Sequence, residues 1–393
     1  MSDINSAVSM QQVDVLFGPK SGRKEALRLL DEGQNRDHIL EQTGMVLGVS
    51  GASLEVPTGS ISVLMGLSGS GKSSLLRCVN GLNTVTRGVL NVQTSNGSVN
   101  VAACKGRALR QLRRGNVAMV FQQFGLLPWA TVRENIGFGL SVRGEAKSLI
   151  EERVQQQLAL VGLDAWADKA IHTLSGGMQQ RVGLARAFAT DADILLMDEP
   201  FSALDPLIRE HLQDELLALQ NRLKKTILFV SHDLDEALKL GNRISIMDGG
   251  RIVQTGSVDE IVFQPANDYV RRFVANINPL SVLNASNIMK PVVMDENKNL
   301  VHQESGLCVI MQADQPVRCL VNGKSYDVKA IDLSANADSG NFSDVVVCVH
   351  DKTPIKALLV RSSTSSLCTL VFDDRGVVCG VIDAQDLCLA LTR

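Results

Sequence analysis

The feature that most constrains this 393-residue chain is a glycine-rich loop that follows an apolar run at residues 61–65. The run ends in Gly-Leu-Ser-Gly-Ser-Gly-Lys-Ser, which fits the pattern Gly-x-x-x-x-Gly-Lys-Ser, and a helix-like stretch follows. Glycines permit the tight backbone that turns successive N–H groups toward phosphate oxygens. The lysine of the pattern reaches the β- and γ-phosphates, and the next hydroxyl is offered to Mg²⁺. The strand–loop–helix context favours a nucleotide phosphate site over a plain turn, with the following candidate cofactor-binding residues: Gly66, Ser68, Gly69, Ser70, Gly71, Lys72, Ser73 and Ser74.

Further short apolar runs without polar alternation are typical of parallel strands that are covered on both faces. Three such runs occupy residues 117–121, 194–197 and 227–230. Polar residues follow them at once: Gln122, Asp198 with Glu199, and His232. Because ligands of open α/β sheets bind beyond the carboxyl ends of the strands, we expect these side chains to meet the glycine-rich loop at one edge. The predicted core is therefore an α/β fold built on a parallel sheet.

The residue types at these strand ends suit phosphoryl transfer. Asp198 is a candidate Mg²⁺ ligand together with Ser73, Glu199 is a candidate general base for the attacking water, and His232 is a candidate contact to the γ-phosphate. Taken alone, Asp198 and Glu199 are also compatible with a helix cap after a strand. His232 alone is equally compatible with a structural histidine in a loop.

A second glycine-containing segment, residues 174–181, places Ser175, Gly176 and Gly177 at a predicted helix start, which is another anion-binding arrangement. The motifs appear in a fixed order: the loop at 66–73, Gln122, the segment 174–181, the acidic strand end at 194–199, the 202–205 loop, and His232. In this order the chain resembles the ATP-binding subunit of ABC transporters over roughly residues 13–275.

The resemblance implies a head-to-tail dimer that buries two ATP molecules, each between the phosphate loop of one subunit and Ser175-Gly176-Gly177 of the other. Phe17 matches the aromatic residue that stacks on adenine, where many relatives have Tyr or Trp. Gln122 would contact Mg²⁺ and the water and couple the site to membrane subunits. Asp205 lies in the loop that communicates across the dimer. ATP closes such a dimer, and hydrolysis with Glu199 and His232 reopens it.

Several segments resemble importers of quaternary ammonium compounds: residues 21–45, 65–68, 177–180 and 231–238. Residues 81–86 and 278–280 look most like the choline-importing branch. We therefore expect an ATPase that energises import of choline, glycine betaine or proline betaine through a membrane permease, with a substrate-binding protein as an indirect partner. The alternatives are an importer of a different small osmolyte, a non-transport mechanical ABC ATPase and a nucleotide-sensing regulator.

The expected domain organisation is an ATPase domain at 1–280 and a second domain at 281–393. Within the first, residues 21–45 read as a two-helix insertion with a packing role, 83–101 as antiparallel β structure, and about 125–185 as a helical subdomain. The stretch 105–114 reads as a basic helix with a solvated face.

The C-terminal segment has α+β character. Its last part, about 350–393, resembles one cystathionine-β-synthase-type (CBS) repeat, because Gly-Val-Ile-Asp at 380–383 followed by Asp386 and Leu387 matches the usual ending. Residues 286–291 resemble the start of a first repeat, whereas the middle of that repeat departs from the pattern. A regulatory CBS pair and an added dimerisation domain both remain open at this point.

Composition limits the kinds of partner and the cellular location that we expect for the protein. The net charge of −3 argues against a nucleic-acid binder. No signal peptide and no apolar stretch of about 18 residues is visible, so we expect a protein at the cytoplasmic face of the inner membrane, held there by its partners. Eight cysteines are present, six of them after residue 300, and none forms a Cys-x-x-Cys pair. They read as buried hydrophobic residues, with redox sensing as the alternative.

Overall fold

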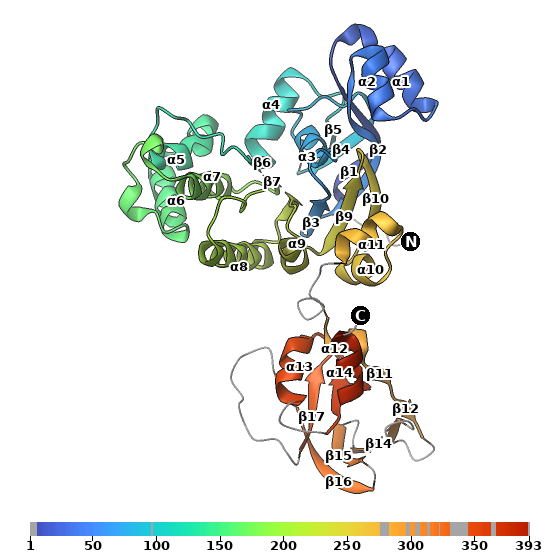
Figure 1. Cartoon of the computed structure of the whole chain (residues 1–393). Coiled ribbons are helices and arrows are strands. Elements are labelled where there is room, and N and C mark those ends of the chain that lie inside the picture. Colours follow the sequence, from blue (N-terminus) through green and yellow to red (C-terminus); the bar gives the residue numbers. More distant parts are fainter. Residues whose placement is uncertain are drawn as a thin grey trace. The chain divides into compact units, whose positions relative to one another are not determined.

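The computed structural model describes residues 6–95, 97–275, 283–295, 299–302, 307–312, 315–321, 323–330, 345–362 and 367–391. It divides into two compact units, Met1–Ala275 and Asn276–Arg393 (Figure 1). From the sequence we expect this boundary slightly later, after residue 280. None of the helices in the described ranges is long and apolar enough to cross a membrane.

The first unit contains a six-stranded, mostly parallel sheet with the strand order β10–β9–β3–β8–β7–β6. Its strands are β3 (Ile61–Met65), β6 (Val117–Val120), β7 (Ile194–Asp198), β8 (Thr226–Val230), β9 (Arg243–Asp248) and β10 (Arg251–Gly256). Every residue of β3, β7 and β8 is buried, which explains why these strands show no polar alternation in the sequence. The four strands predicted to deliver site residues, β3, β8, β7 and β6, are consecutive neighbours and pair in parallel.

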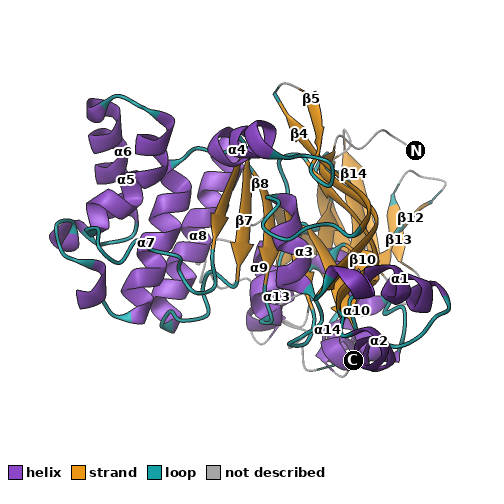
Figure 2. Ribbon diagram, turned by 90° about the horizontal axis from the view of Figure 1, so that it is seen from above, coloured by secondary structure: helices purple, strands orange, loops and turns teal. Residues whose placement is uncertain are grey.

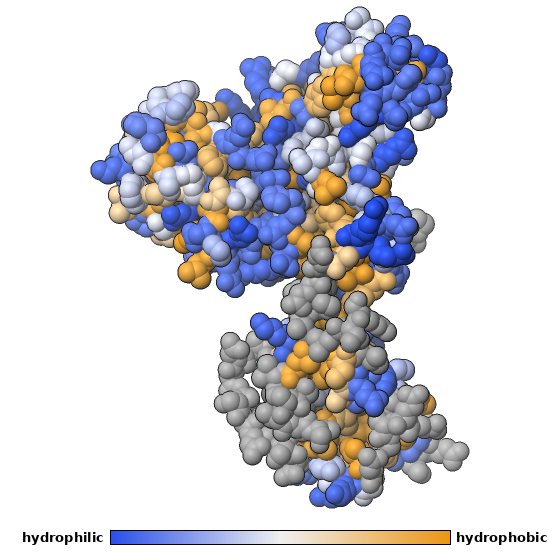
Figure 3. All heavy atoms as spheres, in the orientation of Figure 1, coloured by the Kyte–Doolittle hydropathy of each residue, from blue (hydrophilic) through white to orange (hydrophobic). Residues whose placement is uncertain are grey.

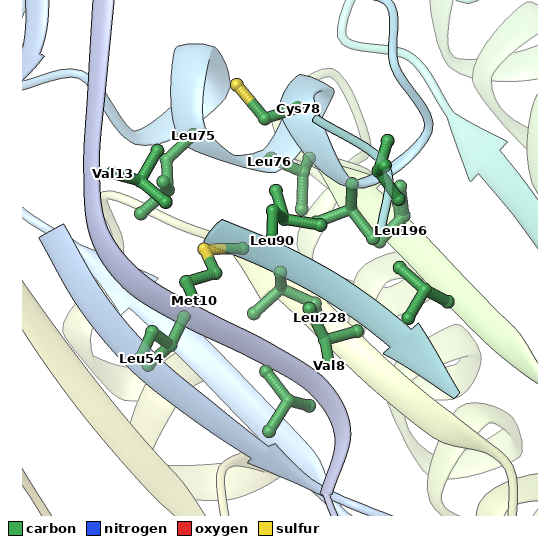
Figure 4. Packing of buried hydrophobic residues seen from close by; sticks show 14 of the residues in the cluster. Val8, Met10, Val13, Leu54, Leu75, Leu76, Cys78, Leu90, Leu196 and Leu228 are labelled. Atoms are coloured by element: carbon green, nitrogen blue, oxygen red, sulfur yellow. The ribbon is translucent and has the colours of Figure 1, made fainter. Parts of the chain in front are cut away.

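A second sheet in this unit is antiparallel, with the order β2–β1–β4–β5. Its strands are β1 (Ser6–Phe17), β2 (Val46–Pro57), β4 (Arg87–Thr94) and β5 (Gly97–Asn100). Helix α3 (Lys72–Val79) lies between the two sheets, and Figure 4 shows its leucines Leu75 and Leu76 among Met10 and Leu90 of the antiparallel sheet and Leu196 and Leu228 of the parallel sheet. Burial of each leucine contributes about 1.5–3 kcal/mol. The helix that carries Lys72 at its start is therefore fixed from both sides.

Helices form the rest of the unit. Helices α5 (Val132–Arg143), α6 (Lys147–Leu160), α7 (Gly176–Ala189) and α8 (Pro206–Leu223) gather on the side of the parallel sheet next to β7 (Figure 2). Helix α4 (Gly106–Gly115) precedes β6, and α9 (Leu234–Leu240), α10 (Val258–Phe263) and α11 (Asp268–Val274) complete the unit. Asp205 caps α8 by accepting a hydrogen bond from the backbone N–H of Ile208, as its position before Pro206 predicts.

Two helices occupy the segment between β1 and β2: α1 (Arg23–Asp31) and α2 (Arg36–Thr43). Asn35 caps α2 by accepting from the N–H of His38, and Gly44 ends it with a φ of 66°. The pair has a small core of its own, in which Ala26, Leu29 and Ile39 are buried.

The second unit is α+β and is built on a nine-stranded sheet with the order β11–β19–β18–β17–β16–β15–β14–β13–β12. Its C-terminal part runs β17 (Val345–His350), α13 (Ile355–Ser362), β18 (Thr369–Phe372), β19 (Val378–Ile382) and α14 (Ala384–Leu391). β17 pairs with β18 in parallel, and β18 pairs with β19 antiparallel. This β-α-β-β-α succession is compatible with the CBS-like domain that the sequence predicts.

The described residues between 283 and 330, where residues 286–291 resemble the start of a first repeat, are mostly strands. This part contains only a four-residue helix, α12 (Ala285–Ile288), and the strands β11 (Lys290–Pro291), β12 (Val293–Met294), β13 (Leu300–His302), β14 (Leu307–Gln312), β15 (Gln315–Val321) and β16 (Lys324–Ala330). Strands β12 to β16 pair antiparallel in succession. The physical reason is the two-residue period of the sequence: in β16, Tyr326 and Val328 pack against the core while Ser325, Asp327 and Lys329 do not.

Candidate nucleotide-binding site

A cavity of about 740 Å³ opens where the parallel sheet, the phosphate loop and α2 meet. Ten of the sequence-predicted site residues line it: Phe17, Ser68, Gly69, Gly71, Lys72, Ser73, Ser74, Gln122, Glu199 and His232. They come from β1, the loop before α3, the first turn of α3, and the positions just beyond the carboxyl ends of three strands. The predicted convergence at one sheet edge is therefore present.

The loop between β3 and α3 has the backbone that its glycines predict. Gly66, Gly69 and Gly71 have φ values of 142°, 78° and 101°. A Cβ at Gly66 would lie 2.2 Å from the carbonyl oxygen of Met247, so this position accepts no side chain. Ser70 is buried under the loop, and its hydroxyl has no hydrogen-bond partner within the described part of the chain. Gly66 and Ser70 shape the loop and do not line the cavity.

Lys72 begins α3 and extends along the loop, where its Nζ donates to the carbonyl oxygens of Gly66 at 2.8 Å and Leu67 at 2.9 Å. Burial lowers the pKa of Lys72 below the ordinary lysine value, and the negative charges of Glu199 and Asp198 oppose that effect. A polyphosphate in this loop would give the buried ammonium anionic partners in place of neutral carbonyls. The loop therefore fits the phosphates of a nucleotide.

A set of oxygen ligands suited to Mg²⁺ lies beside the loop. Asp198 ends β7 fully buried, and its Oδ1 accepts a 2.7 Å hydrogen bond from the hydroxyl of Ser73. Its Oδ2 accepts from Nη2 of Arg77 at 2.9 Å, which compensates the charge of this buried carboxylate. Hydroxyl, carboxylate and amide oxygens are the ligands that Mg²⁺ prefers. The residues Ser73, Asp198 and the nearby Gln122 therefore fit the ion, and Arg77 is a neighbour that the sequence analysis did not name.

Glu199 contacts the other two predicted catalytic side chains, Gln122 and His232. Its Oε2 accepts a hydrogen bond from Nε2 of Gln122 at 3.2 Å and lies 3.3 Å from Nδ1 of His232. The glutamate side chain is mostly buried, whereas that of His232 is 62% exposed. An acidic group held between an amide and an imidazole at the mouth of a phosphate loop can accept a proton from a water molecule there.

Gln180, on helix α7, holds the backbone next to this glutamate. It is almost fully buried, and its Nε2 donates to the carbonyl oxygen of Glu199 at 3.1 Å. The N–H of Ala203 donates to its Oε1 at 3.0 Å. The sequence shows Gln180 as part of the 174–181 motif but gives no signal for this role, because the contact depends on how α7 lies against the loop that follows β7.

The remaining predicted residues lie outside the cavity. Ser175 caps α7 by accepting from the N–H of Met178, and Gly176 and Gly177 form the first turn of that helix. Asp205 is at the start of α8. None of these four residues lines the cavity of its own chain. Their predicted roles at a second subunit's ATP site therefore stay predictions.

Helix α2 contributes a wall that the sequence analysis did not foresee. Arg36, Asp37 and Leu40 line the cavity together with Val46 and Gly48 of β2. The sequence assigns the 21–45 insertion a packing role only. The sequence offered one indication that this insertion lines the site: it begins shortly after Phe17.

Comparison with known proteins agrees with this site. The family model described as "ABC transporter" matches residues 49–202. The glycine betaine/proline betaine transport system ATP-binding protein ProV of Salmonella typhimurium is 40% identical over 388 residues, which cover 96% of each chain. The glycine betaine/carnitine transport ATP-binding protein GbuA of Listeria monocytogenes is 45% identical over 295 residues, covering 75% of this chain and 73% of GbuA.

A third relative is the trimethylamine N-oxide transport system ATP-binding protein TmoW of Ruegeria pomeroyi, 42% identical over 86% of this chain and 93% of that protein. Among solved structures, the dimeric ATP-binding cassette MJ0796 in a post-hydrolysis state with ADP and Pi aligns with a TM-score of 0.55 and 26% identity, covering 64% of this chain and 98% of that one. The order of the motifs, their meeting in one cavity and the match along almost the whole of ProV lead to one conclusion: this chain belongs to the ABC transporter family, as an ATP-binding subunit of the group that includes the betaine transport proteins.

Proposed function

We propose that the protein energises import of a quaternary ammonium osmolyte, with choline as the cargo and glycine betaine as the main alternative. The observation that carries this proposal is the similarity to ProV over 96% of both chains, because ProV is named for glycine betaine and proline betaine transport. Choline and glycine betaine share a trimethylammonium group, so transport systems for either compound must recognise the same cationic group. The segments 81–86 and 278–280 resemble the choline-importing branch and support choline as the specific cargo.

The activity, the cofactors and the partners of the protein follow from its family. The protein is an ATPase that uses ATP with Mg²⁺ and works as a dimer. It is bound to permease subunits at the cytoplasmic side of the membrane.

We also propose the roles of the site residues. Glu199 is the general base: water attacks the γ-phosphorus, its proton passes to the carboxylate of Glu199, and the bond to the bridging oxygen breaks to give ADP and phosphate. Gln122 orients this water, and His232 contacts the γ-phosphate. The supporting observation is that Gln122 and His232 both lie within 3.3 Å of the same Glu199 oxygen.

The binding roles divide between two subunits. Gly66 to Ser74 cradle the phosphates, Lys72 neutralises their charge, and Ser73, Gln122 and Asp198 hold Mg²⁺. Phe17 packs against the base. Ser175, Gly176 and Gly177 of each subunit face the ATP bound by the other, and Asp205 lies in the connection between the two sites. The position of these four residues outside the cavity of their own chain supports this division.

The cargo is tested by uptake of radiolabelled choline, glycine betaine and trimethylamine N-oxide in a strain that lacks the gene. Restoring the gene is expected to rescue choline uptake, and restoring a Lys72→Ala variant is expected to rescue none, because the ammonium that binds the phosphates is gone. Rescue of glycine betaine alone, or of trimethylamine N-oxide alone, would show that choline is the wrong cargo. Rescue of none of the three would reject quaternary ammonium osmolytes as the cargo. It would leave the assignment of this protein as an ATPase unaffected.

A further inference from the structure

The guanidinium of Arg36 joins three segments of the chain at the edge of the phosphate loop. Its Nη1 donates to the carbonyl oxygen of Gly69, in the loop, at 3.0 Å, and its Nη2 donates to the carbonyl oxygen of Gly48, in β2, at 2.9 Å. Arg36 itself begins α2. A planar guanidinium can hold two carbonyls at once, which a single ammonium cannot do with the same geometry. The insertion is thereby connected directly to the loop that binds phosphate.

The guanidinium of Arg36 is tightly packed by neighbouring backbone. A Cβ at Gly250 would lie 2.6 Å from Nη2 of Arg36, and a Cβ at Gly71 would lie 2.3 Å from the same Gly48 oxygen that Arg36 contacts. Burial lowers the pKa of Arg36, while Asp248 and Asp37 oppose the effect, and arginine stays charged because its ordinary pKa is very high. A fixed positive charge therefore lies at the rim of the phosphate loop.

Three large apolar side chains are exposed in the lining of the same cavity. Phe17 is 38% exposed, Leu40 of α2 is 44% exposed and Val46 is 50% exposed, and all three line the same cavity. Phe17 pairs with Val46 across β1 and β2, and its ring lies over Gly48, where a Cβ would be 2.5 Å from the ring. Figure 3 shows apolar atoms beside α2 on a surface that is otherwise largely hydrophilic there. Apolar side chains gathered at a cavity mouth mark a place that a planar apolar group covers.

From these contacts we propose that helix α2 is part of the ATP site: Arg36 positions the phosphate loop, and Leu40 covers the adenine opposite Phe17. This inference rests on the proposed assignment of the cavity to ATP. The insertion then has a function beyond packing, because one helix contacts the nucleotide at its base and holds the loop that binds its phosphates.

The two roles are separated by comparing ATP with inorganic tripolyphosphate, which has the phosphates but no base. Both affinities are measured by isothermal titration calorimetry on the full-length protein. Leu40→Ser is expected to weaken ATP binding about tenfold and to leave tripolyphosphate binding unchanged, because only the contact to the base is lost. Arg36→Gln is expected to weaken both ligands about equally, by roughly tenfold. Arg36→Lys should recover part of that loss, since an ammonium can still hold one of the two carbonyls.

Matched controls lie in the same unit. Arg28→Gln changes an exposed arginine of α1 that pairs with Glu25 and Glu32, and Leu223→Ser changes a leucine of α8 that is 44% exposed. Neither should change either affinity. A thermal melt of each variant without ligand confirms that it is folded.

The proposal is overturned if Leu40→Ser weakens both ligands equally or neither, or if Arg36→Gln leaves tripolyphosphate binding intact. Failure of the underlying site assignment has a different signature. In that case Lys72→Ala would bind ATP as well as the unchanged protein.

Discussion

Glu199 has a backbone conformation that residues other than glycine rarely adopt, with a φ of 50°. Such a conformation costs on the order of 1–2 kcal/mol for an L-residue, so neighbouring contacts must hold it. Hydrogen bonds on both sides of the residue do so: the N–H of Glu199 donates to the carbonyl oxygen of Val230, and its carbonyl oxygen accepts from Gln180 and from the hydroxyl of Ser202. The strain is thus located at the residue that the site geometry makes the candidate base.

Replacing Glu199 with glutamine tests this at the scale of one residue. Glu199→Gln keeps the shape of the side chain and removes its ability to accept a proton. We expect ATP hydrolysis to fall by at least about 100-fold, and an ATP-bound dimer to accumulate because hydrolysis no longer reopens it. Phosphate release and size-exclusion chromatography at several protein concentrations measure the two effects.

The control for this experiment is Glu210→Gln, which changes an exposed glutamate of α8. That variant should hydrolyse ATP at the normal rate. A Glu199→Gln protein that stays monomeric with ATP, or that keeps normal hydrolysis, would count against the assigned base.

At the scale of elements, the loop from β8 to α9 positions His232 through a buried acidic group. Asp233 caps α9 by accepting from the N–H groups of Asp235 and Glu236. Glu236 is 7% exposed, and its Oε2 accepts a 2.7 Å hydrogen bond from the hydroxyl of Ser231. Burial raises the pKa of Glu236, an effect that the hydrogen bond from Ser231 only partly offsets.

This raised pKa gives a pH-dependent prediction. The cost of burying the carboxylate is fully present above the raised pKa of Glu236 and disappears as pH falls below the ordinary glutamate value. Glu236→Gln removes the charge and keeps the polar atoms, so we expect it to stabilise the ATPase unit at pH 8 by about 1 kcal/mol, or about 2–4 °C in melting temperature. The gain should shrink toward pH 5.

Calorimetric melts at pH 5 and pH 8 measure this difference, with the exposed Glu210→Gln as the reference variant. An equal loss of stability at both pH values would contradict the prediction. It would mean that the contacts of the Glu236 carboxylate to Ser231 and the more distant Arg209 stabilise the folded protein more than the contacts of a neutral amide do.

At the scale of the whole molecule, the second unit has its own hydrophobic clusters, which include Leu283, Ile355 and Leu370. Among the described residues, those that line the nucleotide cavity, such as Phe17, Lys72 and His232, belong to the first unit. The CBS-like part of the second unit makes a regulatory role the natural proposal for it.

Truncation after residue 280 tests that role. We expect uptake of the cargo to continue and any dependence of uptake on osmolarity to be lost, because the unit to which we assign a regulatory role is gone. Uptake at low and high osmolarity, with the full chain alongside, measures the change. Unaltered osmolarity dependence would reject the regulatory role, and a weaker dimer with unaltered dependence would instead favour a dimerisation domain.

The sequence predicted the local elements of the site well and their surroundings less well. The phosphate loop and the four consecutive parallel strands could be predicted because each is encoded within a few residues: glycines that permit positive φ, and apolar runs that end in polar residues. The resemblance of residues 286–291 to the start of a first CBS repeat stays a prediction, because it rests on six residues and the described residues that follow are mostly strands.

The sequence by itself determined the candidate chemistry of this protein: a phosphate loop, a candidate magnesium-binding acid, a candidate base and the order of motifs that defines the family. Only the tertiary structure decided which distant residues support that chemistry. Arg36 reaches the loop, Gln180 holds Glu199 and Arg77 pairs with Asp198. The physical reason is that each of these contacts joins residues on different elements, and their distance is set by how helices pack on the sheet rather than by any local pattern.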